Sequence, residues 1–301
     1  MTAEAQAGSS PARLLLRWVT AVLITARPRQ WPKNLLVFAA PLAGATLGRD
    51  DGLGYALVAA AAFGCASVAV YLANDVADAE RDRRHPRKRH RPVAAGDLPK
   101  SHAIAVSAVS AAAGLAAGVV ISEPLLTASV GGYLGISFLY SGLLKHIPVL
   151  ELCFVASGFL LRVLGGAAAT HVRPSGWFLL VCSLGAFGVA VAKRYTELTS
   201  LGPEAIAHRP VMRRYRAGAL RLTQLAAGAA MIGAYLTWAA GQPAGAAAWH
   251  LASGLPLAAA LVRFGVLTGC GTATPVEDLL TRDGPMVACE LAWLALFAAG
   301  L

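Results

Sequence analysis

The sequence predicts an all-α integral membrane protein, and three observations support this prediction. Hydrophobic residues make up 56% of the 301-residue chain, charged residues make up only 14%, and the apolar residues gather in long runs. A soluble domain typically carries about 25% charged residues. The composition therefore excludes a disordered chain, a basic nucleic-acid-binding domain and an ordinary soluble enzyme.

Nine apolar segments are candidates for transmembrane helices, because a helix needs about 20 mostly apolar residues to cross about 30 Å of hydrocarbon. We expect residues 1–301 to form a single membrane domain in which residues 1–12 are flexible. Residues 13–26 mix arginine with Leu, Trp and Val, which predicts an amphipathic helix in the membrane interface. The nine segments cover residues 31–48, 53–74, 102–122, 124–143, 147–169, 174–192, 219–240, 247–268 and 285–301.

Lysine and arginine are distributed unevenly between alternate loops. The 26 Lys and Arg residues exceed the 16 Asp and Glu residues and give a net charge of +10. The N-terminal segment and the loops at 76–100, 143–146, 193–221 and 270–284 hold 22 of these cations, whereas the other loops hold two. Cytoplasmic loops carry an excess of Lys and Arg, so the N-terminus is expected in the cytoplasm. Because topology explains the charge, nucleic acid is not an expected partner.

The strongest site motif lies where the second apolar segment ends, at Asn74, Asp75, Asp78 and Asp82. An α-helix places these four side chains within an arc of about 100°. Carboxylates on one face repel one another, which predicts a cation between them. Asn and Asp oxygens suit Mg²⁺, which typically binds one or two carboxylates together with substrate phosphates. The alternative, a solvated helix end, would not need every oxygen on one face.

A basic run follows this acidic helix end. Residues 85–92 read His-Pro-Arg-Lys-Arg-His-Arg-Pro and include Lys88 and Arg91. Cations beside a metal-binding face form a site for a polyanion such as a diphosphate. The alternative is that these cations only set the topology of the chain.

In this order, the motifs resemble those of the UbiA-type polyprenyltransferase superfamily, whose Asp-rich motif reads NDxxDxxxD. Residues 27–34 (RPRQWPKN) and 85–96 (HPRKRHRPVAAG) are similar to one subgroup, the decaprenyl-phosphate phosphoribosyltransferases. The resemblance covers about residues 27–285. It implies nine transmembrane helices around a central cavity that opens to the cytoplasm, with Mg²⁺ as the cofactor.

The chain departs from the superfamily where a second Asp-rich motif is usual, near the end of the sixth span. Residues 193–197 read Lys-Arg-Tyr-Thr-Glu here, with two cations and one carboxylate. Two Asp-rich motifs suit several Mg²⁺ ions against a prenyl diphosphate, whereas one Asp face with added cations suits a donor with more phosphate groups. Phosphoribosyl diphosphate carries a diphosphate and a 5-phosphate, so the departure favours this donor.

The resemblance implies a role for each residue of the site. Asn74 and Asp78 are expected to bind Mg²⁺, and Asp75 and Asp82 are expected to be catalytic. The residues expected around phosphoribosyl diphosphate are Lys33, Tyr71, Lys88, Arg91, Lys193, Arg194 and Tyr195.

Charges inside the apolar segments need a cavity or a partner, because a charge at bilayer depth costs roughly 2.5–3.5 kcal/mol on insertion scales. Glu151 and Arg162 lie about 16.5 Å apart along one predicted helix, so they cannot pair with each other. The resemblance implies that Arg162, together with Lys145, binds the phosphate of a lipid acceptor. The alternative for Arg162 is a buried ion pair with another helix. Arg263 and Glu290 are candidates for such a pair.

The predicted activity is transfer of 5-phosphoribose from phosphoribosyl diphosphate to a polyprenyl (decaprenyl-type) phosphate, with release of diphosphate, for the synthesis of cell-wall arabinan precursors. The expected location is the plasma membrane, where the multi-pass chain contacts lipid and its active site faces the cytoplasm. A homo-oligomer is compatible with the sequence.

Two other classes of function stay open. One is a prenyltransferase that moves an isoprenoid from a prenyl diphosphate to an aromatic or quinone-precursor acceptor, and the missing second Asp-rich motif counts against it. The other is a transporter, because charges within the membrane also line transport paths. The position of the Asp motif at the membrane edge, rather than at mid-depth, counts against a transporter.

Overall fold

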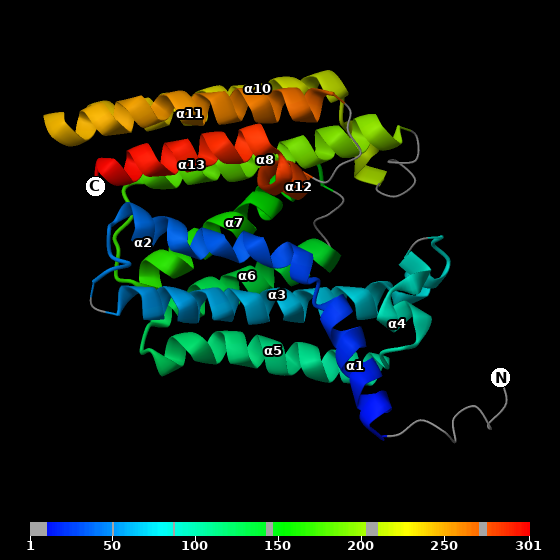
Figure 1. The fold of residues 1–301 in the computed structure, drawn as a ribbon. Helices are drawn as coiled ribbons and strands as arrows, with labels where there is room; N and C mark the ends of the chain where they lie inside the picture. Colours follow the sequence, from blue (N-terminus) through cyan, green and yellow to red (C-terminus); the bar gives the residue numbers. More distant parts are fainter. Residues whose placement is uncertain (1–10, 50, 87, 143–146, 203–209, 271–275) are drawn as a thin grey trace.

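The protein is a bundle of helices that lie side by side (Figure 1). The computed structural model describes residues 11–49, 51–86, 88–142, 147–202, 210–270 and 276–301, and every regular element in these ranges is helical. A multi-pass, all-α membrane protein is therefore confirmed, as expected where backbone polar groups must find partners without water. Among the described residues, six helices are long and apolar enough to cross a membrane, namely α3 (Gly52–Arg83), α5 (Lys100–Val120), α7 (Leu150–Ala169), α8 (Gly176–Leu201), α10 (Ala217–Ala240) and α11 (Ala244–Gly269).

Shorter elements complete the bundle. Two of them, α6 (Pro124–Gly142) and α13 (Gly284–Ala299), are shorter apolar helices. The connecting elements are α4 (Pro92–Ala95), α12 (Val276–Arg282) and the 3₁₀ helices η3 (Lys88–His90) and η5 (Pro210–Arg214).

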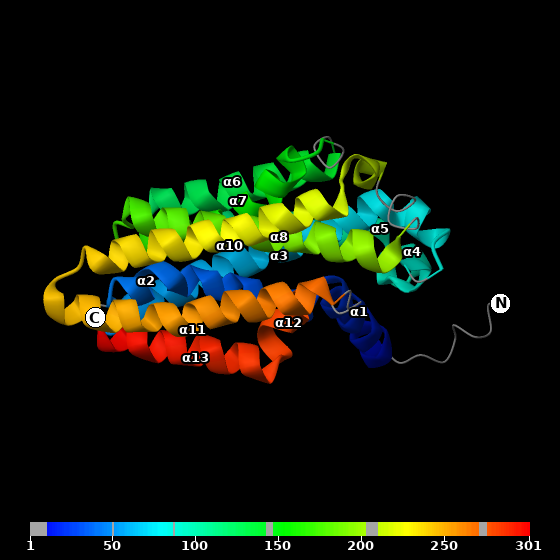
Figure 2. The ribbon, with the colours of Figure 1, turned by 90° about the horizontal axis from the view of Figure 1, so that it is seen from above.

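Successive long helices run in opposite directions, so the loops alternate between the two ends of the bundle (Figures 1 and 2). The ends of α3, α8 and α11 and the starts of α5, α7 and α10 lie at the same end. This is the end that carries the cation-rich loops 76–100 and 193–221. The helix ends next to the cation-rich loops therefore lie together at one end of the bundle.

The first predicted apolar segment, residues 31–48, is not one continuous α-helix. It forms a 3₁₀ helix, η2 (Pro28–Phe38), followed by the short α-helix α2 (Ala39–Ala43). Pro32 lies inside η2, and a proline lacks the N–H that an α-helical hydrogen bond requires. This segment therefore does not supply a ninth continuous helix, and the prediction of a helix over 31–48 was wrong.

The N-terminal helix α1 (Pro11–Thr25) crosses the ends of α3 and α5 obliquely (Figure 1). Trp18 packs against the buried cluster that includes Leu72, whereas Leu15 and Leu16 are exposed. The helix is thus two-sided, as predicted for residues 13–26, and its place in the membrane interface stays a prediction. It starts two residues earlier than predicted, and the remaining residues of the predicted flexible segment, 1–10, lie outside the described ranges.

Glycines allow close contact between helices at the centre of the bundle. A Cβ atom added to Gly166 of α7 would lie 1.8 Å from the backbone oxygen of Val37 in η2. A Cβ atom added to Gly165 would lie 2.4 Å from the ring of Phe63 in α3. Both Val37 and Phe63 are fully buried. The small residues of α7 therefore hold η2 and α3 together, as is usual for helix contacts in lipid.

Replacing Gly166 with alanine should destabilise the protein, because the backbone of η2 must move to accept the added methyl group. Overpacking costs about 1–3 kcal/mol, so the melting temperature in detergent should fall. Gly228→Ala is the matched control, because its added Cβ meets nothing within 4 Å. Equal melting temperatures for the two variants would contradict the described contact between α7 and η2.

Candidate active site

Two aspartates at the end of α3 are buried and share one arginine. Asp75 is 3% exposed and Asp82 is 1% exposed. Arg91, which precedes α4, donates from Nη1 to Asp75 Oδ1 at 3.2 Å and to Asp82 Oδ2 at 2.8 Å. The two aspartates are about two helical turns apart on one face, so a single guanidinium reaches both. Arg91 of the basic run therefore lies between Asp75 and Asp82, and the Mg²⁺ expected at the acidic face stays a prediction.

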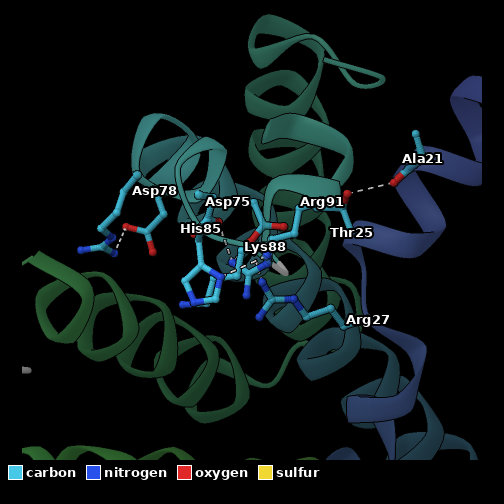
Figure 3. A network of polar contacts seen from close by, with 10 residues as sticks. Ala21, Thr25, Arg27, Asp75, Asp78, His85, Lys88 and Arg91 are labelled. Carbon is cyan, nitrogen blue, oxygen red and sulfur yellow. Dashed lines mark hydrogen bonds and ion pairs between the residues drawn. The ribbon is translucent and has the colours of Figure 1, made fainter. Parts of the chain in front are cut away.

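Arg27 is a second cation on Asp75, and the sequence analysis assigned it no role. Its Nη2 atom donates to Asp75 Oδ1 at 2.5 Å, and its guanidinium carbon lies 5.1 Å from the ring centroid of Tyr71. Its backbone is left-handed (φ 52°, ψ 63°) where the chain turns from α1 into η2. Figure 3 shows Arg27 and Arg91 converging on Asp75 from different segments. The signal in the sequence was the Arg-Pro-Arg-Gln-Trp run, which was read as a family motif.

Asp78 differs from the other two aspartates. Its side chain is 33% exposed, and it accepts from Arg81 Nη2 at 2.6 Å on the side away from Arg27 and Arg91 (Figure 3). Asn74 is half-buried, and α3 stays helical through Arg83, so the four side chains share one arc as predicted.

The oxygen atoms at the end of α3 fit a Mg²⁺ site by their chemistry. Within the described ranges, no three carboxylate, His or Cys side chains are grouped to hold a metal ion. Mg²⁺ usually takes only one or two protein carboxylates and completes its shell with waters and substrate phosphates. Asp78 is the most exposed of the three aspartates, and Asn74 precedes it by one turn. This pair therefore suits an ion that arrives with a phosphate-bearing substrate.

The basic run folds back over the end of α3. The backbone N–H of Lys88 donates to His85 Nδ1 at 3.3 Å, and η3 begins there. Lys88 is labelled in the same close-up as His85, Asp75 and Arg91 (Figure 3), and its role toward the donor stays a prediction. Lys33 lies on η2, where its ammonium group donates to Gln30.

The three consecutive residues predicted on α8 have different neighbours. Arg194 is buried and pairs with Glu151 of α7 (Nε–Oε1, 3.1 Å) and with Glu197 (Nη1–Oε2, 2.5 Å). The ammonium group of Lys193 lies 5.7 Å from the ring centroid of Phe159. The contacts of Arg194 are thus those of an interhelical ion pair, and its role toward the donor stays a prediction. Glu151 pairs with a residue of another helix. This agrees with the prediction that it cannot pair with Arg162, which lies too far along its own helix.

A tyrosine connects the start of α10 to the Glu151–Arg194 pair. The hydroxyl of Tyr215 accepts from the backbone N–H of Val149 at 3.0 Å and is hydrogen-bonded to Glu151. Burial raises the pKa of Tyr215 to about 12. The hydroxyl therefore stays protonated at neutral pH and can donate to the carboxylate.

Arg162 is buried (4% exposed) and held by neutral groups. It donates from Nε to Asn34 Oδ1 at 2.8 Å, from Nη2 to Ser67 Oγ at 2.9 Å and from Nη1 to the Gly158 carbonyl at 2.6 Å. Among the residues that the structure describes, no carboxylate pairs with it, so the alternative of a buried ion pair is not supported. Lys145, its predicted companion, lies outside the described ranges.

The second arginine inside a predicted apolar segment, Arg263, pairs with Asp283, whereas Glu290 was the predicted candidate. The contact is bidentate, from Nε to Oδ1 at 3.0 Å and from Nη2 to Oδ2 at 2.8 Å. Asp283 also caps α13 by accepting from the backbone N–H of Met286 at 3.0 Å. The hydrogen bond from Arg263 lowers the pKa of Asp283. Asp283 precedes α13 and lies outside the predicted apolar segments, so a search for charges within those segments does not point to it.

Replacing Glu151 with glutamine should destabilise the protein by up to about 3–5 kcal/mol, because Arg194 then loses its fully buried partner and keeps only the less buried Glu197. The measurement is the melting temperature in detergent. Glu80→Gln is the control, because Glu80 is exposed and its pairs with Arg83 and Lys100 are on the surface, where ion pairs stabilise little. Equal losses in both variants would contradict a special role for the buried pair.

Comparison with known proteins identifies the family of this chain. Residues 34–268 match the UbiA prenyltransferase family. The chain is 36% identical over 295 residues to the decaprenyl-phosphate phosphoribosyltransferase of Mycobacterium tuberculosis, covering 97% of this chain and 96% of that one. The protein of the same name from Corynebacterium glutamicum is 33% identical over 277 residues, covering 89% and 82%. A UbiA homologue from Archaeoglobus fulgidus bound to GPP and Mg²⁺ has the same fold, with a TM-score of 0.70 at 15% identity over 93% and 98% of the two chains. The chain therefore belongs to the UbiA prenyltransferase family.

Proposed function

We propose that this protein transfers 5-phosphoribose from phosphoribosyl diphosphate to a polyprenyl phosphate of the decaprenyl type and releases diphosphate. The observation that carries the proposal is the gathering of Arg27 and Arg91 at the carboxylates of α3, because mixed cations and carboxylates suit a metal-bound diphosphate. The names of relatives that align with nearly the whole chain support these substrates.

The proposed setting is the plasma membrane, with the basic end of the bundle and the active site in the cytoplasm. Nine segments would cross the membrane if η2 and α2 together count as one. The product would serve the synthesis of cell-wall arabinan precursors. Homo-oligomerisation stays a prediction.

The donor would bind at the end of α3 through its diphosphate. Asn74 and Asp78 would hold Mg²⁺, which when bound neutralises charge on the leaving diphosphate. Lys88 and Arg91 would bind its oxygen atoms, with Lys33 reaching in from η2. Guanidinium and ammonium groups form their strongest hydrogen bonds with such anions. On binding, Arg91 would share its donors between the substrate and the two buried aspartates.

Bond cleavage at ribose carbon 1 leaves oxocarbenium character on the sugar, and the bonding electrons leave with the diphosphate. Asp75 and Asp82 are buried negative groups that would stabilise this positive charge and hold Arg91 in position. An oxygen atom of the lipid phosphate then forms the new bond to carbon 1. This phosphate is ionised at pH 7, so the reaction needs no general base.

The acceptor phosphate would bind at Arg162 and Lys145. Arg162 lies within α7 and is 4% exposed, so the lipid phosphate would have to reach it between the helices. Its hydrogen-bond partners in the described ranges are neutral, which leaves its positive charge for an anionic ligand.

The direct test incubates purified protein with labelled phosphoribosyl diphosphate and several polyprenyl phosphates and measures label in the lipid extract. A parallel reaction supplies labelled prenyl diphosphate with an aromatic acceptor. Product in the first reaction alone supports the proposal, and product in the second alone assigns the alternative prenyltransferase activity.

Asp78→Ala should lower turnover by roughly 100-fold or more. It removes an oxygen ligand of the Mg²⁺ that would stabilise the charge on the leaving diphosphate in the transition state. Excess EDTA should do the same to the parent protein, and added Mg²⁺ should restore activity. Asp97→Ala, which changes an exposed acidic residue of the loop before α5, is the control. Full activity of the parent in EDTA would exclude the proposed role of the metal.

Two further variants should separate the donor site from the acceptor site. Lys88→Ala should weaken phosphoribosyl diphosphate, and Arg162→Ala should weaken polyprenyl phosphate, each by about 10- to 150-fold for one lost charge-assisted contact. Binding of each substrate is measured separately. Lys100→Ala is the control, because this exposed lysine pairs with Glu80. Equal losses of both substrates in both variants would mean that the two sites are not separate.

A further inference from the structure

Arg27 belongs to the candidate site, but the proposed reaction gives it no task. It donates from Nη2 to Asp75 Oδ1 at 2.5 Å, and Arg91 donates from Nη1 to the same oxygen atom at 3.2 Å. Because one carboxylate oxygen accepts from both guanidinium groups, the two arginines are neighbours at the end of α3 (Figure 3). A change at Arg27 is therefore felt directly by Asp75 and by Arg91.

The turn between α1 and η2 fixes the backbone of Arg27. Its φ of 52° and ψ of 63° are left-handed, a conformation that is uncommon for residues other than glycine. Its N–H donates to the Ile24 carbonyl at 3.2 Å, and its carbonyl accepts from the Gln30 N–H at 2.8 Å. The indole N–H of Trp31 also donates to the Ala26 carbonyl at 3.0 Å. Such backbone strain persists where surrounding contacts enforce it and is frequent at functional sites.

The side chain of Arg27 lies across one turn of α3. Its guanidinium carbon lies 5.1 Å from the ring centroid of Tyr71, which precedes Asp75 by one helical turn. The Arg27 side chain is 32% exposed, whereas that of Asp75 is 3% exposed. Arg27 therefore reaches from the surface of the protein to a buried carboxylate.

The distances divide the two arginines between the two buried aspartates. Arg27 makes the shorter contact with Asp75, and Arg91 makes its shorter contact with Asp82, at 2.8 Å. The bond from Arg91 to Asp75 is the longest of the three. A buried carboxylate needs a cation close to it. With Arg27 present, Asp75 has such a cation and depends less on Arg91.

Arg91 is fastened to the aspartates through one nitrogen atom. Both of its hydrogen bonds to carboxylates leave from Nη1, and its side chain is 31% exposed. Among the described residues, its Nε and Nη2 atoms form no hydrogen bond, so they can donate to a substrate anion. Without Arg27, Asp75 would attract Arg91 more strongly and draw these donors towards itself.

We propose that Arg27 is a positioning residue for donor binding: as the counter-ion of Asp75, it leaves Arg91 available to the diphosphate. This inference rests on the proposed function, in which Arg91 binds the diphosphate of phosphoribosyl diphosphate. Arg27 acts through Asp75 and does not itself bind the donor. Its effect should therefore be confined to the donor, because other groups hold Arg162, the proposed ligand of the polyprenyl phosphate.

The test measures binding of phosphoribosyl diphosphate and of polyprenyl phosphate separately, in Mg²⁺, to the parent, Arg27→Gln, Asp75→Asn and the double variant. Arg27→Gln should weaken phosphoribosyl diphosphate by roughly 10-fold or more and leave polyprenyl phosphate unchanged. Once Asp75→Asn has removed the carboxylate, Arg27→Gln should cost less than about threefold more. Arg27→Lys keeps a cation for Asp75 and should recover most of the affinity. Arg29→Gln is the matched control, because it removes an exposed arginine of the same segment and should change neither substrate.

A loss of the same size in the Asp75→Asn background would mean that Arg27 contacts the donor itself, and it would overturn the inference. Equal losses of both substrates in Arg27→Gln would also overturn it, because they indicate a general loss of structure. If Arg27→Gln alone does not fold, the double variant still decides, since it lacks the carboxylate left without Arg27. Its affinity for phosphoribosyl diphosphate should then match that of Asp75→Asn, and a clearly weaker affinity would contradict the inference.

The parent protein separates this inference from the proposed function. If the parent does not bind phosphoribosyl diphosphate, the proposed function fails and this inference fails with it. If the parent and Arg27→Gln bind phosphoribosyl diphosphate equally, only this inference fails.

Discussion

The contact of Arg91 with Asp75 and Asp82 is the interaction on which the candidate site depends. Two carboxylates that are almost fully buried on one helix face would repel each other without a cation between them. Because the cation comes from the basic run that follows α3, the same contact that neutralises the carboxylates also folds this run over the helix end. Arg27, in the turn before η2, donates a second hydrogen bond to Asp75. The acidic and basic motifs are therefore parts of one structure.

Close packing brings the remaining groups within reach. Gly166 allows η2 to approach α7, and this contact brings Asn34 within hydrogen-bond distance of Arg162. The same arginine reaches Ser67 on α3, so one guanidinium joins three elements. A larger residue at Gly166 would separate η2 from α7 and disturb this polar junction. The apolar packing and the polar site thus depend on each other.

The arginines within the long helices fall into two groups. Arg194 and Arg263 face carboxylates. This suits a structural role, because the opposite charges in each pair neutralise each other. Arg162 is held by an amide, a hydroxyl and a carbonyl, so among the described residues its charge is positioned without being neutralised. This difference in partners distinguishes arginines in ion pairs from an arginine whose described partners are neutral.

The sequence by itself determined the all-α membrane fold, the alternation of basic loops and the shared arc of Asn74, Asp75, Asp78 and Asp82, because these follow from composition and from the period of a single helix. It predicted a continuous helix over the first apolar segment, where the chain forms a 3₁₀ helix that contains Pro32.

Only the tertiary structure decided which charges meet. Arg27 and Asp75 are 48 residues apart in sequence, and Arg162 and Asn34 are 128 residues apart. Such contacts depend on how each helix is rotated against its neighbours. Apolar runs rich in alanine and glycine look alike on every face, so the rotation is set by close packing in three dimensions and not by local pattern.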